Sequence, residues 1–347
     1  MIFLTGGTGM LGAHLLYDLT NSGVRVRALK RKNSDLLTVK KIFTWYSNDA
    51  DRLFRQIDWV EGDLLDSISI REAMTGTDTV IHAAAKVSFH PDDSAAMLQE
   101  NAEGTATLVD AALELQVLRF CHVSSIAALG DQDGQLAVNE ELSWKNNRKR
   151  SAYSESKFQA EMEVWRGIQE GLECVIVNPS VILGPGKWHS GSPRFFQSVW
   201  KGMKFYTSGT NGFVDVRDVS RAIISLLQTD NWDAVKNQRF VLSAENRSYR
   251  EIFEAIAVAL ARPKPSIPAN KLLLQLGWRA SRLVSILTGK EPALTRETAR
   301  SSVRKAIYDG AKLSTIIDFS YTPMADTIQQ IGGIFLRENP GPVKIAE

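Results

Sequence analysis

Short apolar runs alternate with amphipathic stretches through the first half of this 347-residue chain. The apolar runs predict strands, and the stretches between them repeat apolar residues every three or four positions, which is typical of helices. The predicted strands are residues 2–5, 24–29, 58–61, 79–82, 119–123 and 174–178, and the predicted helices include 12–22, 66–74, 101–115 and 153–169. This order predicts an α/β fold with a doubly wound parallel sheet that helices cover on both faces.

The alternation stops after residue 178. Residues 178–196 ("NPSVILGPGKWHSGSPRFF") are rich in Gly and Pro and predict a loop region. Residues 212–229 and 238–243 return to a strand–helix–strand pattern, and the C-terminal third is mostly helical. We therefore expect a first domain over residues 1–180, to which residues 213–245 return, and a smaller, mostly helical lobe built from residues 181–212 and 246–347.

Composition limits the classes of protein that the chain can represent. It is 44% apolar and 23% charged, as in ordinary globular proteins, and its net charge of +2 gives no general argument for nucleic acid as a partner. Cys121 and Cys174 lie in apolar runs and predict reduced, buried thiols. With no basic leader and no apolar window of about 18 residues, we expect a cytoplasmic protein without a membrane span. We also expect no metal site.

Four glycines fall in the segment "TGGTGMLG", residues 5–12, between the first predicted strand and the first predicted helix. This context is typical of a Rossmann fold, where N–H groups at the helix N-terminus bind a dinucleotide pyrophosphate. Gly6 allows the tight turn, Gly9 allows close approach of the pyrophosphate, and Gly12 allows helix and strand to pack closely. We expect the cofactor to contact the whole segment: Thr5, Gly6, Gly7, Thr8, Gly9, Met10, Leu11 and Gly12.

The second predicted strand leads into Lys30, Arg31 and Lys32, where NAD sites of this type carry an acid. A guanidinium pairs with a 2′-phosphate through two hydrogen bonds, whereas a carboxylate repels it. The sequence therefore favours NADP over NAD, with Arg31 as the main contact and Lys30 or Lys32 assisting. A solvated basic turn that binds no cofactor is the alternative.

Tyr153 and Lys157 are four residues apart at the start of a predicted helix, so both side chains fall on one face. A phenol has a pKa of about 10, and a neighbouring ammonium favours its charged form. A lowered pKa would make Tyr153 a workable general acid or base at neutral pH. A pair with this spacing also arises by chance in exposed helices, so the pair decides little by itself.

Together these features resemble the extended short-chain dehydrogenase/reductases, also called the NAD-dependent epimerase/dehydratase family. The resemblance covers the chain to about residue 246 and rests on the motifs "TGGTGMLG", "GDL" (62–64), "VIHAAA" (80–85), "NAEGTATLVDAA" (from 101), "HVSSIAALG" (122–130) and "YSESK" (153–157). It implies a catalytic site of Ser125, Tyr153, Lys157 and Asn101. It also implies cofactor contacts at Asp63, Leu64, Ala83, Ala84, Ala85, Tyr153, Lys157, Asn178, Pro179 and Val181.

The family mechanism gives each catalytic residue a role. Tyr153 protonates a carbonyl oxygen as hydride arrives from the nicotinamide, or takes the alcohol proton in reverse. Lys157 holds the nicotinamide ribose and lowers the pKa of Tyr153, Ser125 hydrogen-bonds the same carbonyl oxygen, and Asn101 supports Lys157. Asp218 matches a helix-capping aspartate of the family, so we expect it to be structural.

Three functions are consistent with the resemblance. NADP-dependent reduction of a ketone or aldehyde leads, because Ile126 and Ala127 replace the Asp-Glu pair of the dehydratases and "VNPSVILGPG" resembles the dihydroflavonol and cinnamoyl-CoA reductases. A sugar-nucleotide epimerase is the first alternative, although Asn211 stands where those enzymes carry an arginine that binds the diphosphate. A cofactor-binding regulator without turnover is the second alternative.

We expect the substrate to be a small, apolar or aromatic carbonyl compound. The side chains that could line its pocket are Val87, Phe89, His90, Ala127, Trp188, His189, Phe195 and Tyr206. Residues 270–289 repeat Leu273, Leu276, Ala280, Leu283 and Leu287 at helical spacing and predict a helix that roofs the pocket or packs on the core rather than lying on a membrane. Dimerisation through the helices that follow the fourth and fifth strands is common in the family.

Overall fold

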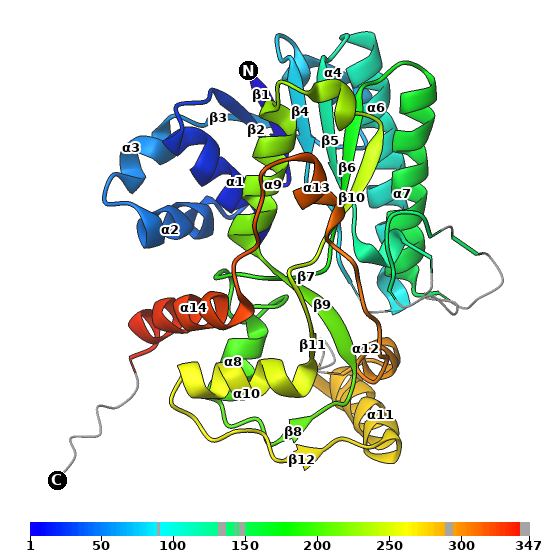
Figure 1. Cartoon of the computed structure of the whole chain (residues 1–347). Helices are drawn as coiled ribbons and strands as arrows, with labels where there is room; N and C mark the ends of the chain where they lie inside the picture. Colours follow the sequence, from blue (N-terminus) through cyan, green and yellow to red (C-terminus); the bar gives the residue numbers. More distant parts are fainter. Residues whose placement is uncertain (89–90, 131–136, 143, 146–149, 289–293, 341–347) are drawn as a thin grey trace.

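A seven-stranded parallel sheet runs through the larger part of the molecule, in the order β10-β6-β5-β4-β1-β2-β3 (Figure 1). This computed structural model describes residues 1–88, 91–130, 137–142, 144–145, 150–288 and 294–340. The strands are β1 (Ile2–Thr5), β2 (Val26–Lys30), β3 (Asp58–Glu61), β4 (Thr79–His82), β5 (Arg119–Val123), β6 (Cys174–Pro179) and β10 (Gln238–Leu242). The predicted α/β fold and its six predicted strands are confirmed, with small shifts at the ends of β2 and β6.

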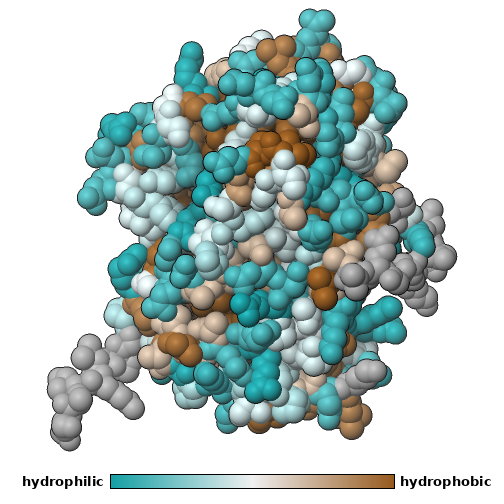
Figure 2. Space-filling model, in the orientation of Figure 1, coloured by the Kyte–Doolittle hydropathy of each residue, from teal (hydrophilic) through white to brown (hydrophobic). Residues whose placement is uncertain are grey.

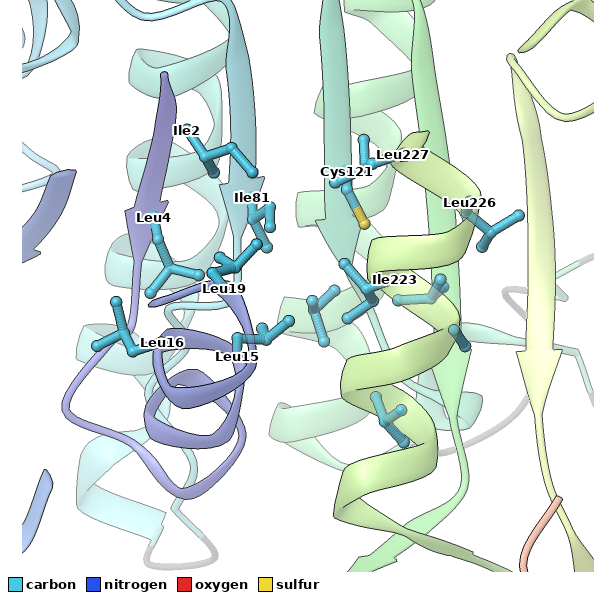
Figure 3. Close-up of a cluster of buried hydrophobic side chains, with 14 of the residues drawn as sticks. Ile2, Leu4, Leu15, Leu16, Leu19, Ile81, Cys121, Ile223, Leu226 and Leu227 are labelled. Atoms are coloured by element: carbon cyan, nitrogen blue, oxygen red, sulfur yellow. The ribbon is translucent and has the colours of Figure 1, made fainter. Parts of the chain in front are cut away.

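Helices cover both faces of this sheet. One face carries α1 (Met10–Asn21), α2 (Leu36–Tyr46), α3 (Ala50–Arg55) and α9 (Val216–Gln228); the other carries α4 (Ser67–Met74), α6 (Gly104–Glu114) and α7 (Ala152–Gln169). Figure 3 shows part of the first core, where α1 and α9 meet the sheet through Leu15, Leu16, Leu19, Ile223, Leu226, Leu4, Ile81 and Cys121. Cys121 and Cys174 are free and buried, as predicted.

The strand order reverses between β1 and β4, which pair directly. In open parallel sheets ligands bind at the carboxyl ends of the strands beside such a reversal. The glycine-rich turn that follows β1 lies at this place. The topology therefore positions one candidate ligand site before any side chain is considered.

The smaller part of the molecule surrounds a second core. Its strands are β7 (Val181–Leu183), β9 (Thr210–Asp215) and β11 (Glu245–Ser248) in one sheet, and β8 (Phe205–Tyr206) and β12 (Ile267–Pro268) in another. Its helices are α8 (Arg194–Trp200), α10 (Tyr249–Ala259), α11 (Lys271–Thr288), α12 (Arg296–Ser301) and α14 (Met324–Glu338); α13 (Lys312–Ile316) lies against β10 and α5 (Ser94–Leu98) against α7. The loop predicted over 178–196 is wrong where β7 and the start of α8 occupy it, because β7 forms only by pairing with the distant β9.

The carboxylate of Glu338, in the last turn of α14, joins the two parts of the molecule. It accepts hydrogen bonds from the indole nitrogens of Trp45 on α2, at 2.6 Å, and of Trp188, at 2.7 Å. Trp188 also packs edge-on against Phe335, with ring centroids 4.9 Å apart. Trp188 therefore belongs to the packing between the two parts.

Helix α11 differs from its prediction. Leu274 is buried, but Leu273 is 38% exposed and Leu276 is 58% exposed, so these two residues do not pack on the core, which is one of the two roles expected for the helix. The side chains of Leu283 and Leu287, and residues 89 and 90, lie outside the described part of the chain. Across the described residues, no helix combines the length and apolarity needed to cross a membrane.

Candidate active site

The glycine-rich turn forms a backbone cradle that has no room for a side chain at Gly6 or Gly12. Gly6 has a φ of +75°, and a Cβ there would lie 2.5 Å from the carbonyl carbon of Ala83. A Cβ on Gly12 would lie 2.1 Å from the carbonyl oxygen of Gly6. Helix α1 starts at Met10, and its N-cap residue, Gly9, supplies no side-chain hydrogen bond to the first turn. The open N–H groups and the helix dipole suit a pyrophosphate, so the cradle fits a dinucleotide.

The turn after β4 is fixed against this cradle. The Thr5 hydroxyl accepts a hydrogen bond from the Ala84 amide at 3.2 Å and contacts Nδ1 of His82 at 2.7 Å. Nε2 of His82 is 2.9 Å from the Thr105 hydroxyl. Ala83 and Ala84 thus lie beside the glycines, as the predicted cofactor site requires, whereas Ala85 is exposed beyond them.

A cavity of about 540 Å³ lies at the ends of β2 and β3. It is lined by Arg31, Lys32, Asn33, Glu61, Gly62, Asp63, Asp66 and Ser69. Of the three basic residues predicted to select NADP, Arg31 and Lys32 therefore share one cavity with Asp63. Lys30 pairs instead with Glu61 at 3.3 Å, and Leu64 packs toward Gly104.

Arg31 has an ion-pair partner that the sequence does not reveal. Its Nη2 lies 2.5 Å from Oε2 of Glu100, whose other oxygen is 3.1 Å from Nζ of Lys86. The hydrogen bond to Glu100 raises the pKa of Arg31, so the guanidinium stays charged. The pair is open to solvent, because the Arg31 side chain is 61% exposed. A competing anion can therefore reach this guanidinium.

Tyr153, Lys157 and Ser125 converge at the carboxyl end of β5. Helix α7 begins after Ser151, whose hydroxyl caps the amide of Ser154 at 2.9 Å. One helical turn separates Tyr153 from Lys157, whose buried Nζ donates to the carbonyl of Val123 at 2.8 Å. The Ser125 hydroxyl hydrogen-bonds the Tyr153 phenol. The structure thus brings together the three residues that the motifs predict.

Burial dominates the electrostatics of this group. It lowers the pKa of Lys157 to about 8, and the negative charge of Glu161 opposes this shift. Burial also raises the pKa of Tyr153, opposed by the hydrogen bond from Ser125. The lowered phenol pKa predicted from the sequence is therefore not found, because desolvation outweighs the effect of neighbouring groups. The phenol carries its proton at neutral pH, which is the form that a proton donor needs.

Two buried histidines lie near Lys157: His82 on β4 and His122 on the neighbouring β5. Their ring centroids are 5.2 Å apart. Burial and the charge of Lys157 lower both pKa values, that of His82 to about 3. Both rings are therefore neutral at ordinary pH, and Lys157 is the cation at this strand end.

Asn101 lies in a π-helical turn, Gln99–Glu103, that precedes α6. Its amide accepts from the backbone N–H of Lys86 at 2.7 Å and donates to the carbonyl of Lys86 at 2.9 Å and the hydroxyl of Ser156 at 3.0 Å. Asn101 therefore fastens the segment after Ala85 to the helix that carries Lys157, rather than contacting Lys157 directly. Short π-helical turns are frequent at functional sites.

Glu161 is a buried residue of this site that the sequence motifs do not single out. Its Oε2 accepts from the Ser124 hydroxyl at 2.6 Å and from Nδ2 of Asn178 at 2.9 Å, and its Oε1 is 3.2 Å from Nη1 of Arg239. Nδ2 of Asn178 also donates to the carbonyl of Ser125 at 3.0 Å. The available signal is spacing, because residues 153, 157 and 161 form one stripe on α7.

The fold and site define a Rossmann-type protein with a candidate dinucleotide site beside a serine, a tyrosine and a lysine. The chain belongs to the NAD-dependent epimerase/dehydratase family, because residues 2–241 match the profile described as "NAD dependent epimerase/dehydratase family". Family members are oxidoreductases and epimerases that use NAD or NADP.

Named relatives of the chain include both reductases and an epimerase. A putative dihydroflavonol 4-reductase of Synechocystis is 30% identical over 315 residues, covering 89% of this chain and 87% of the relative. A cinnamoyl-CoA reductase 1 of Petunia hybrida is 27% identical, covering 66% and 69%, and a UDP-glucose 4-epimerase of Vibrio cholerae is 27% identical, covering 90% and 93%. The crystal structure of gox2253 matches with a TM-score of 0.78 at 26% identity, covering 98% of each chain.

Proposed function

We propose that this protein is an NADPH-dependent reductase of a ketone or aldehyde, with Tyr153 as the general acid. The observation that carries the proposal is the meeting of Ser125, Tyr153 and buried Lys157 at the end of β5, in the same sheet edge as the glycine cradle. A bound nicotinamide supplies or accepts hydride there. The residues of the chain bind and orient the substrate and the cofactor, and they move the proton.

Each side chain acts at a defined atom in this proposal. The Ser125 hydroxyl donates to the substrate carbonyl oxygen and holds it toward the phenol. Tyr153 then donates its proton to that oxygen, or takes it back when the alcohol is oxidised. Lys157, held by the carbonyl of Val123, stabilises the phenolate that remains.

The proposed preference for NADPH rests on the cavity at the ends of β2 and β3. Arg31 and Lys32 line it, and a guanidinium binds a phosphate through two hydrogen bonds. Arg31 must exchange Glu100 for the 2′-phosphate, which its exposure permits. With NAD, the adenosine ribose would meet the same two cations without a phosphate to bind.

An apolar or aromatic carbonyl compound is the proposed substrate. The residues after Ser125 are Ile126 and Ala127, which offer no acid or base for eliminating water. Two reductases among the relatives are named for dihydroflavonol and cinnamoyl-CoA. These names support the substrate class and identify no single compound.

A sugar-nucleotide epimerase is the second candidate, favoured by the Vibrio cholerae relative that covers 90% of this chain. Against it, Asn211 stands where family epimerases carry their diphosphate-binding arginine, and its amide donates to the hydroxyl of Tyr249 at 3.3 Å. This arrangement leaves no cation at position 211.

The test is NADPH oxidation with a panel of aromatic and aliphatic aldehydes, ketones and acyl-CoA esters. We expect turnover with at least one class, and a loss of about 10²- to 10⁴-fold in kcat for Tyr153→Phe with NADPH affinity retained. Conversion of UDP-glucose without net NADPH oxidation would support the epimerase instead. Tight NADPH binding without turnover of either class would support a regulator.

A further inference from the structure

Helix α11 turns leucine side chains toward solvent. Leu272 is 69% exposed and Leu276 is 58% exposed, whereas Leu274 is buried. A helix advances about 100° per residue, so Leu272 and Leu276 share one face and Leu274 lies nearly opposite. The protein-facing side contacts Leu294, whose amide donates to the Ser281 hydroxyl at 3.0 Å. The face of α11 that carries Leu272 and Leu276 is therefore largely exposed to solvent.

Two further exposed apolar side chains lie on the strand pair that precedes α11 in the fold. Ile267 of β12, four residues before the helix, pairs with Phe205 of β8, and these side chains are 42% and 45% exposed. In Figure 1 β8, β12 and α11 lie together at the lower end of the molecule, and Figure 2 shows hydrophobic residues reaching that edge. Isolated exposed leucines are normal on protein surfaces, whereas several exposed apolar side chains in one region are more typical of a binding surface.

The same region concentrates positive charge. Residues 271–288 contain three Lys or Arg and no acid. With residues 294–305 the count is seven basic residues against Glu297 alone, a net charge of +6, whereas the whole chain carries +2. Arg279 also lies over the ring of Trp278, 4.8 Å from its centroid. The charge of this region selects an anionic partner.

We propose that α11 lies on an anionic lipid surface, with Leu272 and Leu276 in the acyl boundary and the basic residues at the headgroups. Amphipathic helices that rest in a membrane interface combine an apolar face, flanking Lys or Arg, and Trp. A second copy fits less well, because two regions of net charge +6 would face each other. The proposal does not depend on the proposed reductase activity.

The test is sedimentation of the full chain with vesicles of phosphatidylcholine alone, or mixed in equal parts with phosphatidylglycerol. We expect binding to the mixed vesicles that salt weakens, and little binding to phosphatidylcholine. The double variant Leu272→Asp/Leu276→Asp should bind the mixed vesicles about tenfold or more weakly. Arg279→Glu/Arg282→Glu should weaken binding and remove most of its salt dependence.

The matched control is Leu118→Asp/Val258→Asp. It changes two aliphatic side chains that lie elsewhere on the surface and are 68% and 64% exposed. It should bind vesicles like the unmodified chain, and all variants should keep the same unfolding midpoint. Equal binding by the α11 variant and the control would overturn the proposal, as would absence of binding to mixed vesicles. A dimer that the α11 variant abolishes, without vesicle binding, would assign this face to a second copy instead.

Discussion

Two carboxylates flank the candidate site and differ in almost every respect. Glu161 is 3% exposed and has fixed partners on three neighbouring segments, at Ser124, Asn178 and Arg239. Glu100 is 24% exposed and pairs with the more exposed cations of Arg31 and Lys86. The comparison separates a fixed side, at the proposed catalytic residues, from an adjustable side, at the proposed adenosine pocket.

The two carboxylates differ because Glu161 is buried and Glu100 is partly open to solvent. A buried charge is tolerated only with several good partners, and removing one leaves the others unpaired. An exposed pair gains little, because water and salt compete for both ions. The partners of Glu161 should therefore stay in place, while the ion pairs of Glu100 can yield to a phosphate at the proposed adenosine pocket.

The largest expected effect is on the fixed side. Glu161→Ala should lower the free energy of unfolding by about 3–5 kcal/mol, because Arg239 and Asn178 lose a buried partner. Glu163→Ala on the same helix breaks an exposed pair with Arg166 and should cost less than about 1 kcal/mol. Urea denaturation measures both. Equal losses would contradict the argument that burial and fixed partners set Glu161 apart from an exposed carboxylate.

Arg31→Ala tests the adjustable side. It should weaken NADPH binding by about 10- to 100-fold and change NADH binding far less, because only the 2′-phosphate uses the guanidinium. Lys30→Ala is the matched control, since Lys30 pairs with Glu61. Fluorescence titration of both cofactors gives the ratio, and an equal loss for NADPH and NADH would refute the role of Arg31.

The titration of Lys157 sharpens the comparison. Its ammonium should lose its proton near pH 8, and Glu161→Gln should lower that midpoint, since a neighbouring negative charge favours the cation. The other titratable groups near Lys157 are His82, His122 and Tyr153. Carbon NMR of labelled lysines in the cofactor-free chain, assigned with Lys157→Met, measures the midpoint. Glu163→Gln should leave it in place, and an upward shift in Glu161→Gln would contradict the argument.

The smallest effect is expected for Glu100→Gln. The substitution releases Arg31 from its ion pair and should tighten NADPH binding by about two- to fivefold, with little change in stability. Isothermal titration at low and high salt measures it. Weaker NADPH binding would show that Glu100 holds Arg31 in place for the phosphate rather than competing with it.

Local sequence signals predicted the elements that depend on short-range patterns. The strands β1 and β3 to β5 and the glycine turn carry their periodicity and their Gly positions within a few residues. Strand β7 lacks such a signal, because it pairs with β9 about thirty residues later. Helix α11 was predicted as a helix, but its spacing alone could not tell which neighbour, if any, covers its leucines.

The candidate site also contains residues that local motifs predict and contacts that join distant parts of the chain. Ser125, Tyr153 and Lys157 could be predicted because each lies within a short sequence motif. The pair of Arg31 with Glu100 joins positions 69 residues apart, and that of Glu161 with Arg239 joins positions 78 residues apart. Such contacts depend on the folded chain, so only the structure reveals them.

The π-helical turn Gln99–Glu103 has a consequence for how this chain tolerates change in length. A π turn holds one residue more than the α-helical turn it replaces. Deleting a single residue there would restore regular α-helix and rotate the preceding segment by about 100° relative to α6. Asn101 would then leave the backbone of Lys86 and the hydroxyl of Ser156, although every hydrophobic residue of α6 kept its place. A one-residue deletion at this turn would therefore change the geometry of the candidate site, whereas a deletion in an exposed loop would change only the length of that loop.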